Sequence, residues 1–341
     1  MELRRTLRPA AAITTVALMF GLTACGGSTE SAPVGDSDAG SSGAAAEETL
    51  PITVARGGVN FENAVLAEDQ GYFEEVGLDI GEMQLTGMGG AAANSSVISG
   101  EFDVAATDAV TVIRAAAEGM PVVAVAGTKS ADPDYEGEVS DGVIVPPGSD
   151  IKEWSDLAGT KIGVPELGGL PHMATVTGLL ENGVDLDSVE FVPLPTDALV
   201  ESAAKGQVDA VFTFSIFLLS AVDNGFTRVG TGVREYLPNA PQVLWVASKQ
   251  FAEENPEALE RFHTAIEKGT EYANENEDAV REAYHEHTEL PAAFIDERMS
   301  MEPLNVEFDE EGWNTLLQVM KDESDLREDL TYEEIVWEGA R

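Results

Sequence analysis

Two stretches of the chain, about 110 residues apart, follow the same pattern, and this internal repeat limits the folds open to it. Residues 99–104 (SGEFDV) and 205–210 (KGQVDA) each place a glycine three residues before an aspartate, followed by an apolar run. Upstream strands recur in the same order, at spacings of 110, 109 and 106 residues for the pairs Val54 and Val164, Leu85 and Leu194, and Asp103 and Asp209. Each copy predicts strand, helix, strand, helix, strand, so we expect two similar α/β halves.

A glycine-rich turn opens the central helix of the first copy. Gly87, Gly89 and Gly90 follow the strand that ends at Leu85, and residues 91–99 are alanine-rich and compatible with a helix. Glycine permits a tight turn, and the first N–H groups of a helix have no partner within it. The helix therefore offers a place for an anion or a polar head group, reinforced by its dipole.

Length and charge narrow the class of protein. A chain of 341 residues with 43% hydrophobic residues is long enough for about two domains with real cores. The net charge of −43 argues against nucleic acid as a partner, because a strongly negative protein is repelled by phosphate.

The amino terminus reads as a targeting segment. Arg4, Arg5 and Arg8 precede an apolar run over residues 10–22, which is too short to span a bilayer comfortably. The run ends in LTAC, which resembles the lipobox of bacterial lipoproteins, and Cys25 is the only cysteine in the chain. The resemblance implies a lipoprotein signal peptide over residues 1–25 and lipidation of Cys25.

A tether and two lobes follow from composition and from the order of the elements. Residues 26–49 are rich in Gly, Ser and Ala and predict a flexible tether. Beyond the second copy, a strand at 242–247 returns the chain to the first half, and helices are expected over 255–274, 277–286, 291–300 and 310–320. We therefore expect one lobe from 50–128 and 242–341 and another from 129–241. A two-strand hinge would join them, and the helical tail would pack on the first lobe.

Several motifs together resemble one family. Residues 70–78 (QGYFEEVGL) resemble the GYF-x-x-x-GL signature of substrate-binding proteins of ABC importers, in the branch that binds sulfonates, taurine, nitrate and thiamine-pyrimidine precursors. Residues 99–104, 156–164 (DLAGTKIGV), 206–210 and 255–257 also fit that pattern. The resemblance covers roughly residues 51–290. It implies the type II periplasmic-binding-protein fold, with two Rossmann-like lobes that close around one small molecule for delivery to ABC permease subunits.

The resemblance also implies which loops line the cleft, because ligands bind at the carboxyl ends of strands in open α/β sheets. In the first lobe the candidates are Asn60, Phe61, Gly89, Gly90, Ala91, Thr107 and Asp108. In the second they are Glu166, Gly168, His172, Thr213, Phe214 and Ser215, and Trp245 lies on the return strand. Phe214 stands where many relatives have a tryptophan, and the acidic residue of their motif is absent.

Two ligand classes are compatible with the sequence. The family implies first a small organic anion of the sulfonate, taurine or nitrate type. Asp108 would suit an amino group, and Phe61 and Phe214 could stack on a flat ring. A thiamine-pyrimidine-like heterocycle is therefore the alternative.

Cofactors, metals and catalysis have little support in the sequence. Gly87-x-Gly89 resembles a dinucleotide fingerprint but is not on the first strand, and residues 132–137 begin like a calcium loop that lacks its final glutamate. No nucleophile elbow, P-loop or zinc motif is present. We expect a monomeric binding protein without cofactor or metal, held at the extracytoplasmic face of the cell membrane by its lipid. An exported enzyme that uses Asp108 and Glu166 as acid and base is the remoter alternative.

Overall fold

The computed structural model describes residues 49–57, 60–85, 90–137, 141–323, 326–327 and 329–341. The predicted signal peptide, Cys25, the tether up to residue 48 and Gly89 lie outside these residues. Within them, every helix is too short or too polar to cross a membrane.

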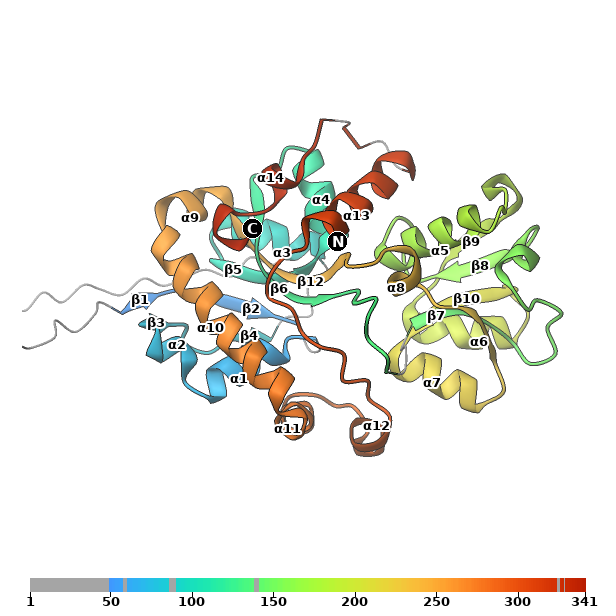
Figure 1. The fold of residues 1–341 in the computed structure, drawn as a ribbon, viewed down its shortest axis with the longest axis horizontal. Helices are drawn as coiled ribbons and strands as arrows, with labels where there is room; N and C mark the ends of the chain where they lie inside the picture. Colours follow the sequence, from blue (N-terminus) through green and yellow to red (C-terminus); the bar gives the residue numbers. More distant parts are fainter. Residues whose placement is uncertain (1–48, 58–59, 86–89, 138–140, 324–325, 328) are drawn as a thin grey trace, which may run out of the picture. The chain divides into compact units, whose positions relative to one another are not determined.

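Two five-stranded sheets contain the repeat (Figure 1). The first has the order β4 (Gln84–Leu85), β2 (Val54–Arg56), β5 (Val104–Asp108), β12 (Pro241–Ser248) and β6 (Val122–Ser130). The second has the order β9 (Glu190–Pro193), β8 (Lys161–Val164), β10 (Ala210–Phe214), β7 (Asp141–Val145) and β11 (Thr227–Gly230). In each sheet the first three strands of this order are parallel to one another. The fourth strand is antiparallel to both of its neighbours, the third and the fifth. The two halves therefore share one topology, and the predicted α/β fold class is confirmed. A separate short pair joins β1 (Leu50–Pro51) to β3 (Leu78–Asp79).

The repeated Gly-x-x-Asp turn does the same structural work in both halves. Gly100 and Gly206 have φ of 73° and 67°, a left-handed conformation that glycine adopts at low cost. Three residues later, a carboxylate oxygen of Asp103 accepts a hydrogen bond from the backbone N–H of Thr53, and one of Asp209 accepts from that of Lys161, both at 2.8 Å. The aspartate thus ties its own strand to the start of the neighbouring parallel strand.

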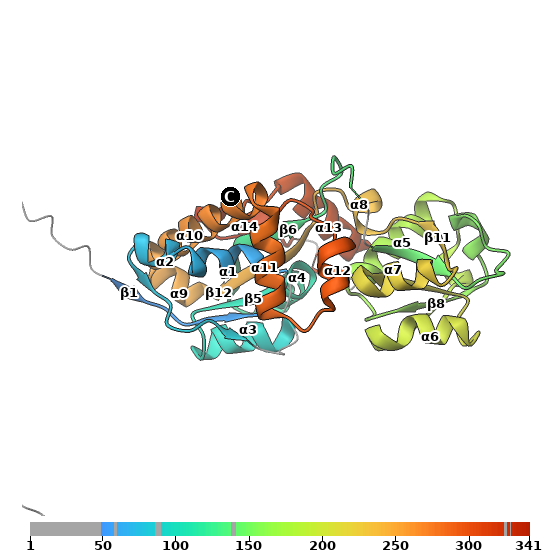
Figure 2. The ribbon, with the colours of Figure 1, turned by 90° about the horizontal axis from the view of Figure 1, so that it is seen from below.

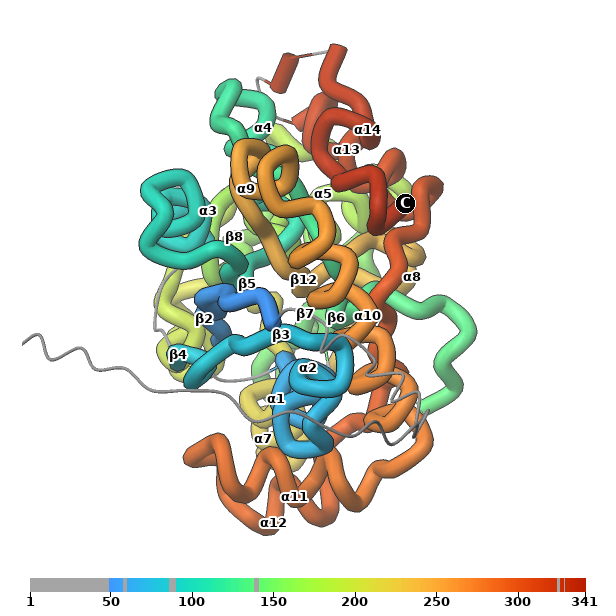
Figure 3. Tube along the Cα trace, turned by 90° about the vertical axis from the view of Figure 1, so that its left-hand side faces the viewer, coloured from blue at the N-terminus to red at the C-terminus, as the bar shows by residue number. Residues whose placement is uncertain are grey.

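Successive side chains along the strands of the first sheet point to opposite faces, and each face packs against a layer of helices. Val54, Val104 and Trp245 face a layer made by α1 (Glu62–Asp69), α2 (Tyr72–Glu75) and α10 (Pro256–Glu275). Ala55 and Ala105 face the other layer, which contains α3 (Gly90–Ser99), α4 (Ala109–Ala117) and α14 (Tyr332–Ile335). Figure 3 shows α4 and α1 on opposite sides of the strands. Both faces of the sheet are covered, which agrees with the continuous burial of residues 122–128 in β6.

The second sheet is covered in the same way. Ala210 and Phe212 face α5 (Leu170–Glu181) and the short helix η1 (Trp154–Leu157). Val211 faces α6 (Leu199–Ala204) and α7 (Ser215–Asp223). The remaining elements of this half are the short helices η2 (Leu186–Ser188), η3 (Thr196–Ala198) and α8 (Val233–Tyr236).

The helical tail packs on the first lobe and also reaches the second. It contains α9 (Lys249–Glu254), α10, α11 (Glu277–His287), α12 (Ala292–Glu297), α13 (Glu310–Glu323), α14 and η4 (Glu338–Ala340). The backbone N–H of Trp337 donates to the carbonyl of Ala124 in β6 at 2.9 Å. Phe294 of α12 packs in the cluster formed around α7, and Arg298 pairs with Asp223 at 2.6 Å. Figures 1 and 2 both show α12 beside α7.

Two local features concern the strand before the glycine-rich turn and the boundary between the lobes. The segment over residues 78–85 is divided into β3 and β4, because Gly81 adopts φ 57° and its N–H donates to the side chain of Asp79 at 3.0 Å. β6 continues past residue 128 to Ser130, which pairs with Pro241 of β12. These two strands form the crossing between the halves.

Candidate functional site

A cavity of about 480 Å³ is lined by residues from both sheets and from the tail. The first half contributes Asn60, Asp108, Lys129, Gln242 and Val243. The second half supplies residues at the end of β10 and the starts of β7, α5, α7 and α8. The tail adds Tyr284, Leu290, Phe294, Met299, Ser300 and Glu302. The cavity thus lies at the carboxyl ends of the parallel strands, where open α/β sheets bind ligands.

Two lining residues have unusual backbone conformations. Asn60 has φ 61° and precedes α1, and Ser215 has φ 53° and follows β10. Such conformations cost about 1–3 kcal/mol for residues other than glycine and gather at ligand sites. Both residues were predicted from the sequence to lie at the cleft, and each stands where a strand turns into a helix.

Asp108 is held by its own helix. It is the N-cap of α4, where its carboxylate accepts from the backbone N–H of Thr111 at 2.9 Å and from the Thr111 hydroxyl at 2.6 Å. Gly90 lies directly against this cap: a Cβ added there would be 2.5 Å from the Thr111 Oγ1 and 2.7 Å from an Asp108 oxygen. Gly90 therefore leaves room for the capped carboxylate.

Replacing Gly90 with alanine is expected to break this arrangement. The new methyl group must displace Thr111 or Asp108, so we expect Gly90→Ala to lower the free energy of unfolding by about 1–3 kcal/mol, as overpacking and loss of a cap do. Urea denaturation measures the change. Gly169→Ala is the control, since its Cβ would meet nothing closer than 3.5 Å at φ −75°. Equal stability of the two variants would contradict the prediction.

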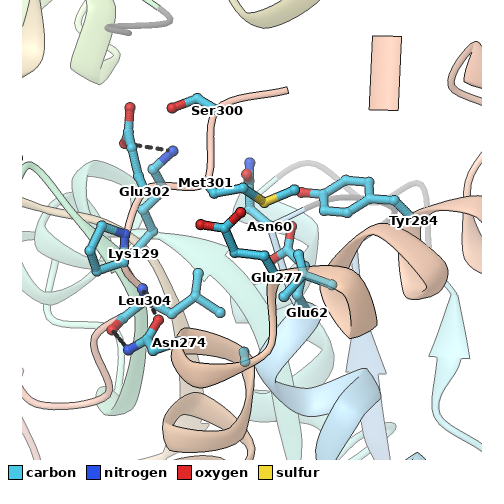
Figure 4. Close-up of a pocket in the computed structure, with 13 residues that line it drawn as sticks. Asn60, Glu62, Lys129, Asn274, Glu277, Tyr284, Ser300, Met301, Glu302 and Leu304 are labelled. Atoms are coloured by element: carbon cyan, nitrogen blue, oxygen red, sulfur yellow. Dashed lines mark hydrogen bonds and ion pairs between the residues drawn. The ribbon is translucent and has the colours of Figure 1, made fainter. Parts of the chain in front are cut away.

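A buried ion-pair network crosses one wall of the cavity. The Glu302 carboxylate lies 2.9 Å from the Nζ of Lys129 and 3.1 Å from an Nη of Arg234. Lys129 belongs to β6, Arg234 to α8 of the second half and Glu302 to the tail. Arg234 also donates to the carbonyl of Tyr135 at 2.9 Å and lies over its ring. Figure 4 shows the Lys129–Glu302 pair.

Asp141, at the start of β7, has an unsatisfied oxygen. One carboxylate oxygen accepts from the backbone N–H of Val233 at 3.1 Å. The other, Oδ1, is buried and has no hydrogen-bond partner among the described residues. Burial raises the pKa of Asp141, with a smaller contribution from nearby Glu302. A solute that donates a hydrogen bond would satisfy this oxygen.

The rest of the wall is mainly apolar and aromatic. β10 and α7 contribute Phe212, Phe214 and Phe217, while Phe294 and Met299 face them from the tail. Such a wall accommodates a flat or apolar body, and a few polar groups then set its orientation.

A smaller pocket of about 100 Å³ adjoins the cavity (Figure 4). The two share Asn60, Lys129, Tyr284, Ser300 and Glu302. Glu62, at the start of α1, also lines the small pocket; it is buried, and its Oε2 lacks a hydrogen-bond partner among the described residues. Burial raises the pKa of Glu62. The described part of the chain holds no cluster of three or more His, Cys, Asp or Glu residues suited to a metal ion.

The structure brings four of the predicted site residues to the cavity, namely Asn60, Asp108, Phe214 and Ser215. Another four are buried away from its lining: Phe61, Thr107, Thr213 and Trp245. The lining also excludes Gly90, Ala91, Glu166, Gly168 and His172, of which Ala91 and Glu166 are exposed to solvent. Gly89 is outside the described residues.

Loops near His172 and Gly168 join the two halves instead. Arg114 of α4 donates to the carbonyl of Gly168 at 2.6 Å. The backbone N–H of Gly168 donates to the Nδ1 of His172 at 2.9 Å, and the imidazole meets the Phe191 ring edge to face at 4.4 Å. Burial, and to a smaller extent the charge of Arg114, lowers the pKa of His172 to about 4.

This depressed pKa predicts a pH-dependent stability. In the unfolded chain histidine titrates near pH 6.5. Between about pH 6.5 and about 4 the unfolded chain binds the extra proton, so falling pH destabilises the folded state. We expect the melting temperature of His172→Gln, relative to the wild type, to rise as the pH is lowered from 7 to 4.5. Gly169→Ala, which removes no titrating group, should keep a constant difference. A constant difference for His172→Gln as well would disprove the assignment.

Apart from Asp108, sequence reasoning missed the charged residues of the cavity. Arg56, at the end of β2, is buried beside a small neighbouring pocket, where it donates to the carbonyl of Gly57. Among the described lining residues the cations are Lys129 and Arg234. The predicted boundary between the lobes at residues 128 and 129 could have indicated Lys129. No local pattern indicated Arg234 or Glu302, which are brought in by tertiary packing.

Comparison with known proteins agrees with this architecture. Two α/β sheets with a cavity at their strand ends form the periplasmic-binding-protein fold. The model of the NMT1/THI5-like family matches residues 59–280, more than half of the chain. The chain therefore belongs to the NMT1/THI5-like family.

One curated relative is named as a binding protein, from Brucella abortus (strain 2308). It is 27% identical over 151 residues, a match that covers 40% of this chain and 43% of the relative. The chain thus matches less than half the length of this relative.

Solved structures show the same fold at low sequence identity. The periplasmic aliphatic sulphonate binding protein SsuA of Escherichia coli aligns with a TM-score of 0.72 and 16% identity, covering 86% of this chain and 99% of that one. The periplasmic nitrate-binding protein NrtA of Synechocystis PCC 6803 gives 0.60 and 11%, covering 83% of each chain. The desulfurization enzyme DszB also aligns, with 0.62 and 15%, covering 85% and 97%. The fold by itself thus accommodates both binding proteins and an enzyme.

Proposed function

We propose that this chain is the extracytoplasmic solute-binding protein of an ABC importer and that it captures one small organic solute in the cavity between its two sheets. The observation that carries the proposal is the cavity itself: it has an aromatic wall, contributions from both halves, and a buried carboxylate oxygen of Asp141 that has no partner within the described part of the chain. Closure of two lobes on such a cavity is the common way in which binding proteins hold a ligand.

Two solute classes compete for the cavity. The named ligands of the SsuA and NrtA structures support a sulfonate- or nitrate-type anion. The geometry favours a solute with a flat or apolar body and an amino or ring N–H donor, because Asp141 and the adjoining Glu62 each have an oxygen that no described residue satisfies. An aminopyrimidine of the thiamine-precursor type meets both conditions. Taurine, which carries an amine beside its sulfonate, is the second candidate.

The same proposal includes a lipid anchor at Cys25, delivery to permease subunits, and a monomeric state. The anchor depends on the lipobox-like LTAC at residues 22–25. Cys25→Ser should then release the protein from the membrane fraction into the soluble fraction.

The competing function is an enzyme that shares this fold, as DszB does. Against it, Glu166 is exposed and lies outside the cavity lining, while the Asp108 carboxylate is engaged by Thr111. The two carboxylates named as acid and base are thus not presented together to one solute.

A calorimetric panel tests the proposal. Purified protein lacking the signal peptide is titrated with 4-amino-5-hydroxymethyl-2-methylpyrimidine, taurine, ethanesulfonate and nitrate, and each mixture is then analysed for chemical change. We expect saturable binding of the aminopyrimidine with a negative heat-capacity change and no product. Product formation would overturn the binding-protein assignment, and binding of ethanesulfonate or nitrate alone would overturn the ligand class.

A further inference from the structure

The carboxylate of Glu302 occupies the position where an anionic solute would find positive charge. Of the described residues that line the cavity, only Lys129 and Arg234 have cationic side chains, and both contact Glu302. Each carboxylate oxygen faces one of them, Oε2 facing Lys129 and Oε1 facing Arg234. Both cations are thus already paired with a carboxylate from within the chain.

Burial makes this ion pairing strong. The side chains of Lys129, Arg234 and Glu302 are 18%, 13% and 11% exposed. Charges that are largely removed from water interact more strongly than pairs on the surface. An anion entering beside Glu302 would meet a like charge at short range. Asp108 and Asp141 line the same cavity and add to its negative character.

We propose that Glu302 is a specificity-determining residue, a built-in counter-ion that excludes simple anions from the cavity and reserves it for solutes with a cationic or hydrogen-bond-donating group. The inference rests on the proposed binding function and names the residue that sets the charge class of the solute. Glu302 lies in the tail and contacts Arg234 of the second half. The counter-ion is therefore in place when β6, α8 and the tail are packed together.

Glu302→Gln tests the inference, with ethanesulfonate as the probe because it has an anionic head and no amine. In the wild type we expect no measurable binding by calorimetry at low ionic strength. The variant removes the carboxylate that pairs with both Lys129 and Arg234, so we expect it to bind ethanesulfonate at least about tenfold more tightly than the wild type does. Ethanesulfonate should also raise the melting temperature of the variant and not that of the wild type.

Asp223→Asn is the matched control. It removes another ion pair between the tail and the second half, Arg298–Asp223, which does not line the cavity. This control should gain no affinity for ethanesulfonate. An equal gain would mean that loosening the tail is sufficient and would overturn the role of Glu302.

Other outcomes also decide the question. Equal ethanesulfonate binding by the wild type and Glu302→Gln, or none by either, overturns the inference while leaving the solute panel above to judge the binding function. Should the single variant fail to fold, Arg234→Gln with Glu302→Gln removes one charge of each sign and still leaves Lys129 unpaired. The same gain in ethanesulfonate affinity is then required.

Discussion

Replacing Asp141 by asparagine is expected to weaken binding of the aminopyrimidine by about 100-fold, the loss typical of a hydrogen bond to a charged group. The buried Oδ1 of Asp141 has no partner among the described residues and can accept from a solute in the cavity, whereas an amide NH₂ at that place would oppose the donor. Isothermal titration of both proteins at pH 7 measures the change.

The same substitution should leave the fold intact. Asparagine can keep the bond from the N–H of Val233, and burial has raised the pKa of Asp141, so the folded state carries a cost for its charge above that pKa. We therefore expect an equal or slightly higher melting temperature, as is common when a polar site residue is neutralised. Asp150→Asn, on an exposed turn, is the control and should change neither quantity. Unchanged affinity of Asp141→Asn would refute the role of this carboxylate.

Trp245→Ala is expected to have the largest effect on stability, a loss of about 3–5 kcal/mol in the free energy of unfolding. Trp245 is fully buried in β12, an inner strand of the first sheet. Its ring centroid lies 5.0 Å from that of Phe61 and 5.4 Å from that of Phe262, and both contacts are edge to face. Deleting the indole would leave a cavity that the close-packed layer of α1 and α10 cannot fill.

Urea denaturation measures this loss against two other variants. Trp245→Phe retains an aromatic ring and should lose less, whereas Leu180→Ala, at a side chain 48% exposed, should stay within about 0.5 kcal/mol of the wild type. A loss for Trp245→Ala no greater than that for Leu180→Ala would contradict the packing argument.

Titration of Trp245→Phe with the aminopyrimidine also tests the prediction that Trp245 contacts the solute. Its burial leads us to expect unchanged affinity.

The charge on the cavity has a consequence for how relatives can differ. Similar folds can bind sulfonate or nitrate, because the strand ends offer a cavity whose polar groups are set by individual side chains. Here Lys129 and Arg234 are both engaged by a residue of the tail. We therefore expect a change at position 302 alone to alter the preferred charge of the solute while the scaffold is kept.

The sequence by itself determined the scaffold, because the signals for the scaffold are local. The repeated Gly-x-x-Asp turns, the apolar runs and the motif at residues 70–78 predicted two α/β halves, the crossing strands and the helical tail. The structure explains why the aspartate recurs in these turns, since the side chains of Asp103 and Asp209 accept hydrogen bonds from the start of the neighbouring strand. Asn60, Asp108, Phe214 and Ser215 could be placed at the cavity because each follows a strand, and position after a strand is visible in sequence.

Only the tertiary structure decided the chemistry of the cavity. Lys129 and Glu302 are 173 residues apart in the chain, with Asp141 and Arg234 between them, and the four meet because β6, β7, α8 and the tail pack together. Whether a candidate side chain faces the cavity or the core was likewise undetermined. Thr213 alternates with the lining residues Phe212 and Phe214 along β10 and is buried, and Trp245 lies two residues beyond the lining residue Val243 and is buried in the core. The physical reason is that charge pairing and burial depend on contacts between distant segments, which no local pattern encodes.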